Sequence, residues 1–150
     1  METRKQKLHN ACLSQLNHRL EAMTSAIRQI QLSANEETKS SAGDKYETGR
    51  AMAQLEIEKH NLQLEDVKRM KQDLIRIDPL DQSDVVKTGS LVFTDRGNFY
   101  IAINAGEIDI DQKKFITIST AAPLARKLIG LHAKSSFSLN GLEFTILEIQ

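Results

Sequence analysis

Hydrophobic residues recur at alternating spacings of three and four along the first part of the chain. Between residues 8 and 32 these apolar positions are Leu13, Leu16, Leu20, Met23, Ile27 and Ile30. Charged and polar residues fill the positions between them. This is a heptad pattern, in which one narrow apolar line faces a single partner helix. We therefore predict a helix over 8–32 that pairs with another helix.

A second helical pattern covers residues 45–77. Its apolar line is predicted to run through Met52, Leu55 and Leu62, and then, with a shift, through Leu64, Val67, Leu74 and Ile77. Because only a short segment separates the two arms, they should pair antiparallel as a hairpin over residues 1–78. At about 1.5 Å rise per residue, such a hairpin would reach roughly 45 Å. A rod this thin suits reach and contact better than a pocket.

The tip of the predicted hairpin lies near residues 33–50. Gly43 can adopt the positive φ of a turn, and Asp44 with Glu47 has the capping-box spacing that opens a helix. The tip also carries Glu36, Glu37 and a lone aromatic residue, Tyr46. An aromatic side chain on a thin rod is more suited to contact with a partner than to a core.

Composition changes after Pro79, and residues 79–84 are interpreted as a linker. In residues 85–150 we predict strands at 91–95 and 98–105 joined at Arg96-Gly97, a strand at 115–119 and a short helix over 120–131. Two more strands, 136–139 and 142–149, should flank an Asn140-Gly141 turn. The predicted fold class is therefore α+β, an antiparallel coiled-coil hairpin followed by a small antiparallel sheet with one helix.

Charge and cysteine content narrow the function. The chain has 20 basic and 20 acidic residues, so reliance on nucleic-acid phosphates is not the first expectation. One cysteine, Cys12, forms no internal disulfide and fits a reducing compartment, where we expect it to pack as a small apolar residue. The sequence shows no signal peptide and no membrane span, so a cytoplasmic, monomeric protein without membrane contact is predicted.

The sequence contains no motif for an intrinsic active site. It has no nucleophile elbow and no Gly-rich phosphate loop, and its four histidines are scattered. The tip carboxylates Glu36, Glu37, Asp44 and Glu47 allow two interpretations. They cap a helix and keep the tip soluble, or they help to hold Mg²⁺ in another protein's active site, with Asp44 as the expected metal ligand in such a complex.

The stretch Ile118-Ser119-Thr120-Ala121-Ala122-Pro123-Leu124-Ala125-Arg126-Lys127-Leu128-Ile129-Gly130 resembles the I-S-x-x-S-P-L-A-R-A-L-I-G stretch of Gre-type bacterial transcription elongation factors. Residues 144–149 are similar to the closing strand of that family. The layout of hairpin, linker and C-terminal domain is similar over nearly the whole chain.

This resemblance implies an FKBP-like C-terminal domain that docks at the secondary channel of DNA-directed RNA polymerase. It implies that residues Pro123, Leu124, Arg126, Lys127 and Gly130 contribute to polymerase binding. It also implies that the hairpin tip reaches toward the catalytic centre and the RNA 3′ end. In cleavage factors of this family, tip carboxylates support Mg²⁺ shared with the polymerase. The chain would then have no cofactor and no active site of its own.

The tip departs from the family pattern, which resembles Asp-Leu-Ser-Glu-Asn-x-Glu-Tyr. With the family tyrosine aligned on Tyr46, Lys39 and Ala42 occupy the two metal-binding positions. The leading hypothesis is thus a polymerase-binding elongation factor that stimulates cleavage of backtracked RNA. The alternatives are a channel-binding regulator or inhibitor without cleavage activity, a peptidyl-prolyl isomerase, and a chaperone-like module that self-associates through its coiled coil.

Overall fold

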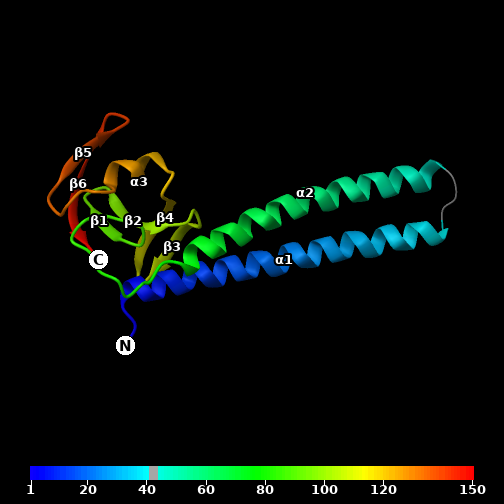
Figure 1. The fold of residues 1–150 in the computed structure, drawn as a ribbon, viewed down its shortest axis with the longest axis horizontal. Helices are drawn as coiled ribbons and strands as arrows, with labels where there is room; N and C mark the ends of the chain where they lie inside the picture. Colours follow the sequence, from blue (N-terminus) through cyan, green and yellow to red (C-terminus); the bar gives the residue numbers. More distant parts are fainter. Residues whose placement is uncertain (41–43) are drawn as a thin grey trace. The chain divides into compact units, whose positions relative to one another are not determined.

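The computed structural model describes the backbone of residues 1–40 and 44–150, and the side chains of residues 1–36 and 47–150. Two long helices come first, α1 (Arg4–Ser40) and α2 (Asp44–Ile75) (Figure 1). The remaining elements are β1 (Leu91–Thr94), β2 (Gly97–Ala102), β3 (Gly106–Ile110), β4 (Lys113–Ser119), α3 (Pro123–Leu128), β5 (Ser136–Leu139) and β6 (Leu142–Ile149). The fold is α+β, as predicted.

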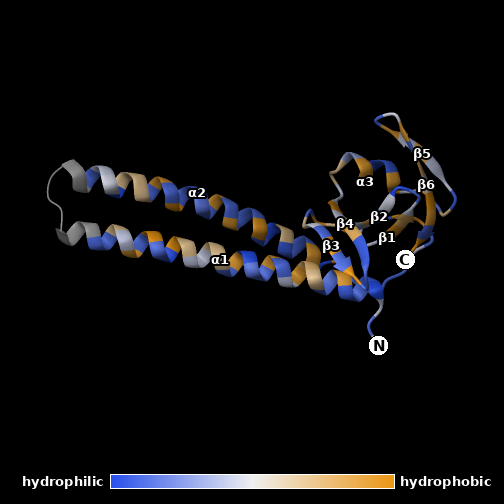
Figure 2. Ribbon diagram, turned by 180° about the vertical axis from the view of Figure 1, so that it is seen from behind, coloured by the Kyte–Doolittle hydropathy of each residue, from blue (hydrophilic) through white to orange (hydrophobic). Residues whose placement is uncertain are grey.

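The chain divides into two compact units. The hairpin unit, Leu16–Arg69, consists of the middle and distal parts of α1 and α2. The sheet unit combines Met1–Gln15 with Met70–Gln150, so the first part of α1 belongs with the sheet. Figure 2 shows hydrophilic and hydrophobic residues alternating along both long helices.

In the hairpin unit the two helices lie side by side, and near their distal ends residues from both line one groove. The predicted apolar line of α1 is confirmed. Leu16 is fully buried, and Leu20, Met23, Ile27 and Ile30 are half-buried, whereas the residues between them are mainly exposed. A single partner helix shields a line of this width and leaves the rest of α1 to solvent.

The predicted apolar line of α2 was wrong in its first half. Met52, Leu55 and Leu62 are 67%, 66% and 71% exposed. A straight helix keeps one heptad phase, and the phase that continues through Leu64 and Val67 does not include those three residues. The shielded positions of that phase are Ala53, Ile57, His60, Leu64 and Val67. The His60 ring is tolerated at this position because its Nδ1 donates to the Glu56 carbonyl at 2.8 Å.

The sheet has six strands in the order β3-β4-β2-β1-β6-β5. The prediction was an antiparallel sheet, whereas the observed sheet is mixed because it contains one parallel pair. β2 and β4 pair in parallel, and the other neighbours pair antiparallel. The chain leaves β2, forms β3 at the sheet edge and returns as β4, and this path makes β4 parallel to β2. The turn between β1 and β2 is Asp95-Arg96, one residue earlier than predicted, because Gly97 pairs with Thr94.

Both faces of the sheet are covered within the sheet unit. On one face, Phe99 and Ile101 of β2 pack with Ala125 and Leu128 of α3 in the main core cluster. Successive strand residues point to opposite faces, so Tyr100 points the other way. There it meets the first part of α1, where His9 bonds to its hydroxyl. The base of α1 is therefore a structural layer of the sheet unit.

Candidate functional site

The hairpin tip places two of its predicted acidic residues on the surface. Glu36, near the end of α1, and Glu47, in the first turn of α2, are both exposed. α2 begins at Asp44, as the capping-box pattern predicts. The side chains of Glu37, Asp44 and Tyr46 lie outside the described residues, so the metal-ligand prediction for Asp44 stays a prediction.

The tip residues do not fit the metal pattern of cleavage factors. Mg²⁺ needs oxygen ligands, and Lys39 and Ala42 supply none at the positions where that family has carboxylates. Among the residues that the structure describes, no three His, Cys, Asp or Glu side chains are grouped to hold a metal ion.

The α3 surface combines exposed cations with an apolar base. Pro123, Arg126, Lys127 and Gly130 are exposed, whereas Leu124 is half-buried against the core cluster. Arg126 and Lys127 occupy the last turn of α3, where positive charge suits the carbonyl end of a helix. Neither of them forms an ion pair with any described residue. This surface can bind an acidic partner without first breaking a salt bridge.

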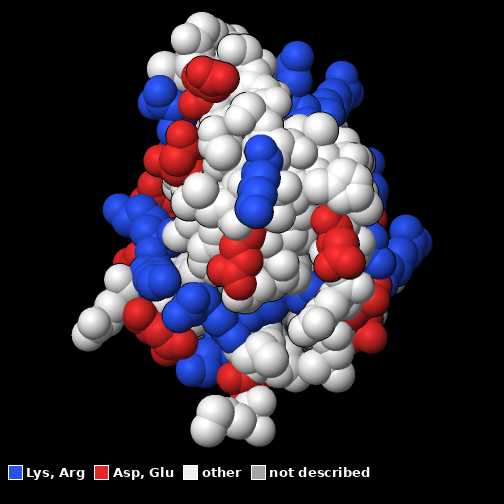
Figure 3. Space-filling model, turned by 90° about the vertical axis from the view of Figure 1, so that its left-hand side faces the viewer, with Lys and Arg blue, Asp and Glu red and all other residues white. Residues whose placement is uncertain are grey.

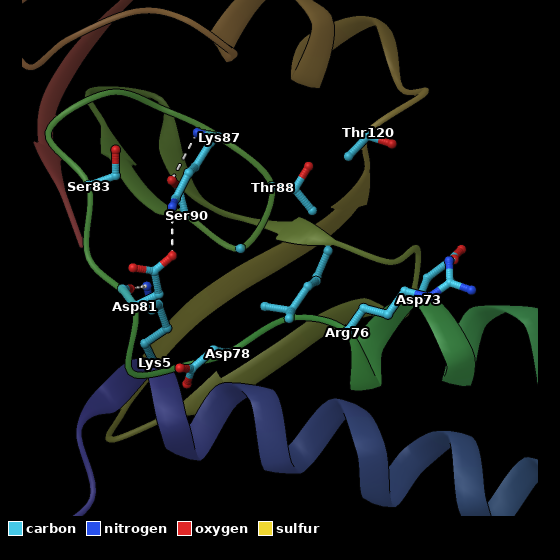
Figure 4. Close-up of a pocket in the computed structure, with 13 residues that line it drawn as sticks. Lys5, Asp73, Arg76, Asp78, Asp81, Ser83, Lys87, Thr88, Ser90 and Thr120 are labelled. Carbon is cyan, nitrogen blue, oxygen red and sulfur yellow. Dashed lines mark hydrogen bonds and ion pairs between the residues drawn. The ribbon is translucent and has the colours of Figure 1, made fainter.

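A cavity of about 460 Å³ lies within the sheet unit (Figure 4). Its wall consists of the start of α1, the end of α2, residues 78–83, the loop before β1, the end of β2 and the residue after β4. Three basic, three acidic and four hydroxyl side chains line it: Lys5, Arg76, Lys87, Asp73, Asp78, Asp81, Ser83, Thr88, Ser90 and Thr120.

Asp81 is the centre of the charge network in this cavity. Its backbone carbonyl accepts a hydrogen bond from Lys5 Nζ at 2.5 Å, and its carboxylate accepts one from Lys87 Nζ at 2.6 Å. The hydrogen bond from Lys87 and the charge of that residue lower the pKa of the Asp81 carboxyl. Lys5 is only 5% exposed, and this burial lowers the pKa of its ammonium group.

The charges of the cavity are largely matched inside it. Arg76 pairs with Asp73 at 3.7 Å, and Asp78 accepts a hydrogen bond from the Leu80 backbone N–H at 2.9 Å. A ligand of one sign would have to displace one of these partners. The network is therefore best explained as a tie between α1, the linker and the loop before β1, rather than as a binding site.

At Gly89, in the cavity wall, the backbone lies close to the Ile77 side chain. Its φ of +92° belongs to the left-handed region, and an added Cβ would lie 2.9 Å from the Ile77 side chain. Its N–H donates to the Ile101 carbonyl at 2.7 Å, which holds this loop against β2. A larger residue at this position would strain the contact between the end of α2 and the sheet.

A second polar cluster, missed by the sequence analysis, is buried between α1 and the sheet. His9 Nδ1 lies 2.8 Å from the Tyr100 hydroxyl, and their rings meet edge to face. Burial lowers the pKa of His9, with a smaller contribution from the charge of Lys5 and an opposing one from Asp78. In the sequence, His9 is visible only as a histidine next to Leu8 on a predicted helix. That position does not predict Tyr100 as its partner.

Burial also keeps the Cys12 thiol and the Tyr100 phenol protonated. The pKa of the Cys12 thiol is raised to about 12 and that of the Tyr100 phenol is raised above its usual range. A thiol that stays protonated at neutral pH is a poor nucleophile. Cys12 is fully buried, so the prediction that it packs as a small apolar residue is confirmed.

Comparisons with known proteins do not assign a family. No family model matches the chain, and no curated protein matches it. No helix in the described part of the chain has the length and apolar content that a membrane crossing requires. The resemblance to Gre-type factors therefore stays a prediction from the sequence.

Proposed function

We propose that this protein is an RNA-polymerase-binding transcription elongation factor of the Gre type, with an FKBP-like sheet domain. The resemblance of residues 118–130 to the family stretch carries this proposal. Support comes from the order of the elements, in which a long helical hairpin precedes a sheet domain with one short helix. The residues of that stretch form the end of β4 and the helix α3, which buries Ala125 and Leu128 and exposes Arg126 and Lys127.

In this proposal the α3 surface anchors the protein on the polymerase. Arg126 and Lys127 contribute charge, and Pro123, Leu124 and Gly130 contribute shape and apolar contact. The hairpin unit enters the secondary channel and brings Glu36, Glu37, Asp44, Tyr46 and Glu47 toward the RNA 3′ end. The chemistry takes place in the polymerase, and the protein itself is not an enzyme.

A specific observation favours a second candidate, a channel-binding regulator or inhibitor without cleavage activity. Lys39 and Ala42 stand where cleavage factors have their metal-binding carboxylates. A tip without those ligands can occupy the channel but cannot deliver Mg²⁺ in the same way. Both candidates share the same anchor, so they differ only in what happens at the tip.

Two experiments separate these possibilities. A pull-down of purified core polymerase tests the anchor. The Arg126→Glu/Lys127→Glu double variant should lose binding. Lys114→Glu, an exposed charge change on β4 outside α3 and the hairpin unit, should retain it. Failure of the wild-type chain to bind polymerase would contradict the whole proposal.

RNA cleavage on a stalled, backtracked complex tests the tip. Cleavage that Asp44→Ala or Glu47→Ala abolishes supports a cleavage factor with displaced ligands. Binding that leaves cleavage at the basal rate, or lowers it, supports the regulator. A variant carrying Lys39→Asp and Ala42→Glu should gain cleavage if only the ligands are missing.

A further inference from the structure

The sheet has two open edges, and they differ in charge. β3 and β5 are the outer strands of the order β3-β4-β2-β1-β6-β5. β3 carries two exposed carboxylates, Glu107 and Asp109, within five residues. Charged residues on an edge strand discourage pairing with another chain. β5 reads Ser-Phe-Ser-Leu and carries no charge, so only β3 is guarded in this way.

The backbone of β5 offers hydrogen-bonding groups to a further strand. Leu139 and Leu142 flank the two-residue turn Asn140-Gly141 and form the bonded pair that closes it. Bonded and non-bonded pairs alternate in an antiparallel ladder, so Ser136 and Ser138 lie in non-bonded pairs. The 3.0 Å contact between the Ser136 and Thr145 hydroxyls agrees with the closer spacing of such a pair. The N–H and C=O groups of Ser136 and Ser138 therefore point away from β6.

The side chains of β5 set the pattern that an added strand must continue. Phe137 and Leu139 are half-buried and pack against the core cluster under α3. Ser136 and Ser138 are exposed on the opposite face of the strand. An added strand extends the sheet best when its apolar side chains alternate with polar ones, with the apolar set on the α3 side.

Three exposed cations, Arg126, Lys127 and Lys134, lie on α3 or just before β5. α3 contacts β5, and its Arg126 and Lys127 are exposed. Lys134 is also exposed and lies two residues before β5. Within the described chain these three cations form no ion pair, and the carboxylate that faces β5 from β6 is Glu143, opposite Ser138. Figure 3 shows the side of the molecule that carries β5 and β6, where charges of both signs are interspersed with uncharged surface.

We infer that the β5 edge is a docking site for an extended segment of a partner protein. The segment pairs with the backbone of Ser136 and Ser138 and places alternating apolar side chains beside Phe137 and Leu139. Acidic residues at its ends meet Arg126, Lys127 and Lys134. This site shares Arg126 and Lys127 with the proposed polymerase anchor, but its strand pairing at Ser136 and Ser138 does not require the polymerase.

The test uses the full chain labelled with ¹⁵N and a synthetic peptide in which Val and Thr alternate between two acidic residues at each end. Saturating peptide should slow amide hydrogen exchange at Ser136 and Ser138 by at least about tenfold, because each amide gains an acceptor. The amides of β3 should not change. A peptide with lysines in place of the acidic residues should bind at least about tenfold more weakly, since its charges would meet Arg126, Lys127 and Lys134. Equal affinity for both peptides would contradict the charge assignment.

A matched pair of variants tests the strand-pairing mechanism. Ser138→Pro removes an N–H that faces outward and leaves the β5–β6 bonds in place, whereas Ser138→Thr keeps that N–H. Binding should be lost in the first and retained in the second. If Ser138→Pro lowers the melting temperature, a peptide N-methylated at its central residues applies the same test from the partner's side.

Three results would overturn the inference. They are no exchange protection with peptide in millimolar excess, equal binding by the Ser138→Pro and Ser138→Thr variants in their folded states, and protection that rises with protein concentration when no peptide is present. The last result would mean that β5 pairs with a second copy of the chain. Polymerase binding by Ser138→Pro, measured in parallel, keeps the outcome separate from that of the proposed function.

Discussion

The buried contact between His9 and Tyr100 gives a sharp prediction for the Tyr100→Phe variant. This change keeps the fully buried ring in place and removes only the hydroxyl. His9 Nδ1 then loses its partner at a position that solvent hardly reaches. Leaving a buried polar atom unsatisfied costs about 1–3 kcal/mol, so we expect the free energy of unfolding to fall by about 2 kcal/mol. For a chain of this size that corresponds to a melting temperature about 4–8 °C lower.

Urea unfolding followed by circular dichroism measures the change, and exchange of the Ile101 amide reports on the sheet unit itself. That amide donates to the Ser90 carbonyl inside the sheet unit. The double variant His9→Leu/Tyr100→Phe removes both polar partners, so it should recover part of the loss. His132→Gln, a change at an exposed histidine, serves as the control and should alter stability by less than about 0.5 kcal/mol. Stability of Tyr100→Phe within about 0.3 kcal/mol of the wild type would refute the reasoning, since a bond of that kind is worth more.

Three further predictions follow from burial in both units. Because burial lowers the pKa of His9, its contribution to the free energy of unfolding should be full above the unfolded-state pKa, near 6.5, and should decline as pH falls below that value. In urea titrations between pH 5 and 8, His9→Gln should flatten this decline. An equal decline in both proteins would show that His9 does not cause it. Cys12, with its thiol pKa raised to about 12, should react with a thiol reagent at pH 8 only at the rate of unfolding, so rapid labelling of the native protein would be inconsistent with its burial. In α2, Val67→Ala should cost about 1–2.5 kcal/mol and Leu62→Ala less than about 0.5 kcal/mol in thermal unfolding. A cost for Leu62→Ala as large as that for Val67→Ala would contradict the exposed position of Leu62.

Local patterns predicted the parts of this fold that depend on neighbours in sequence. The Asn140-Gly141 signal gave the β5–β6 hairpin with its bounds, because both turn residues adopt the positive φ that the signal requires. The apolar line of α1 was predicted because no second phase competes with it. In α2 two apolar lines with heptad spacing overlap. The prediction followed the line of Met52 and Leu55 because their side chains are large, but that line is exposed and the line of Ala53 and Ile57 is the shielded one.

Features that depend on distant residues were not predictable in the same way. The parallel pairing of β2 and β4 follows from where β3 is placed, and no short pattern records that choice. The contact between His9 and Tyr100 joins residues 91 positions apart. The tip residues were predicted from their residue types and the capping-box spacing, and their role stays a prediction. The residues that line the cavity were found only from the structure.

The placement of residues 1–15 in the sheet unit has a consequence for synthesis of the chain. Leu8, His9 and Cys12 leave the ribosome well before the sheet, and the surface they cover does not exist until β2 and β4 have been made. These side chains must therefore stay exposed, or within a nascent helix, for about a hundred residues of translation, which takes about 5–20 seconds at about 5–20 residues per second. A fragment that begins at residue 85 would lack the first part of α1, so the sheet face that carries Tyr100 would be exposed. Expression trials on separate halves should therefore yield less soluble protein than the intact chain.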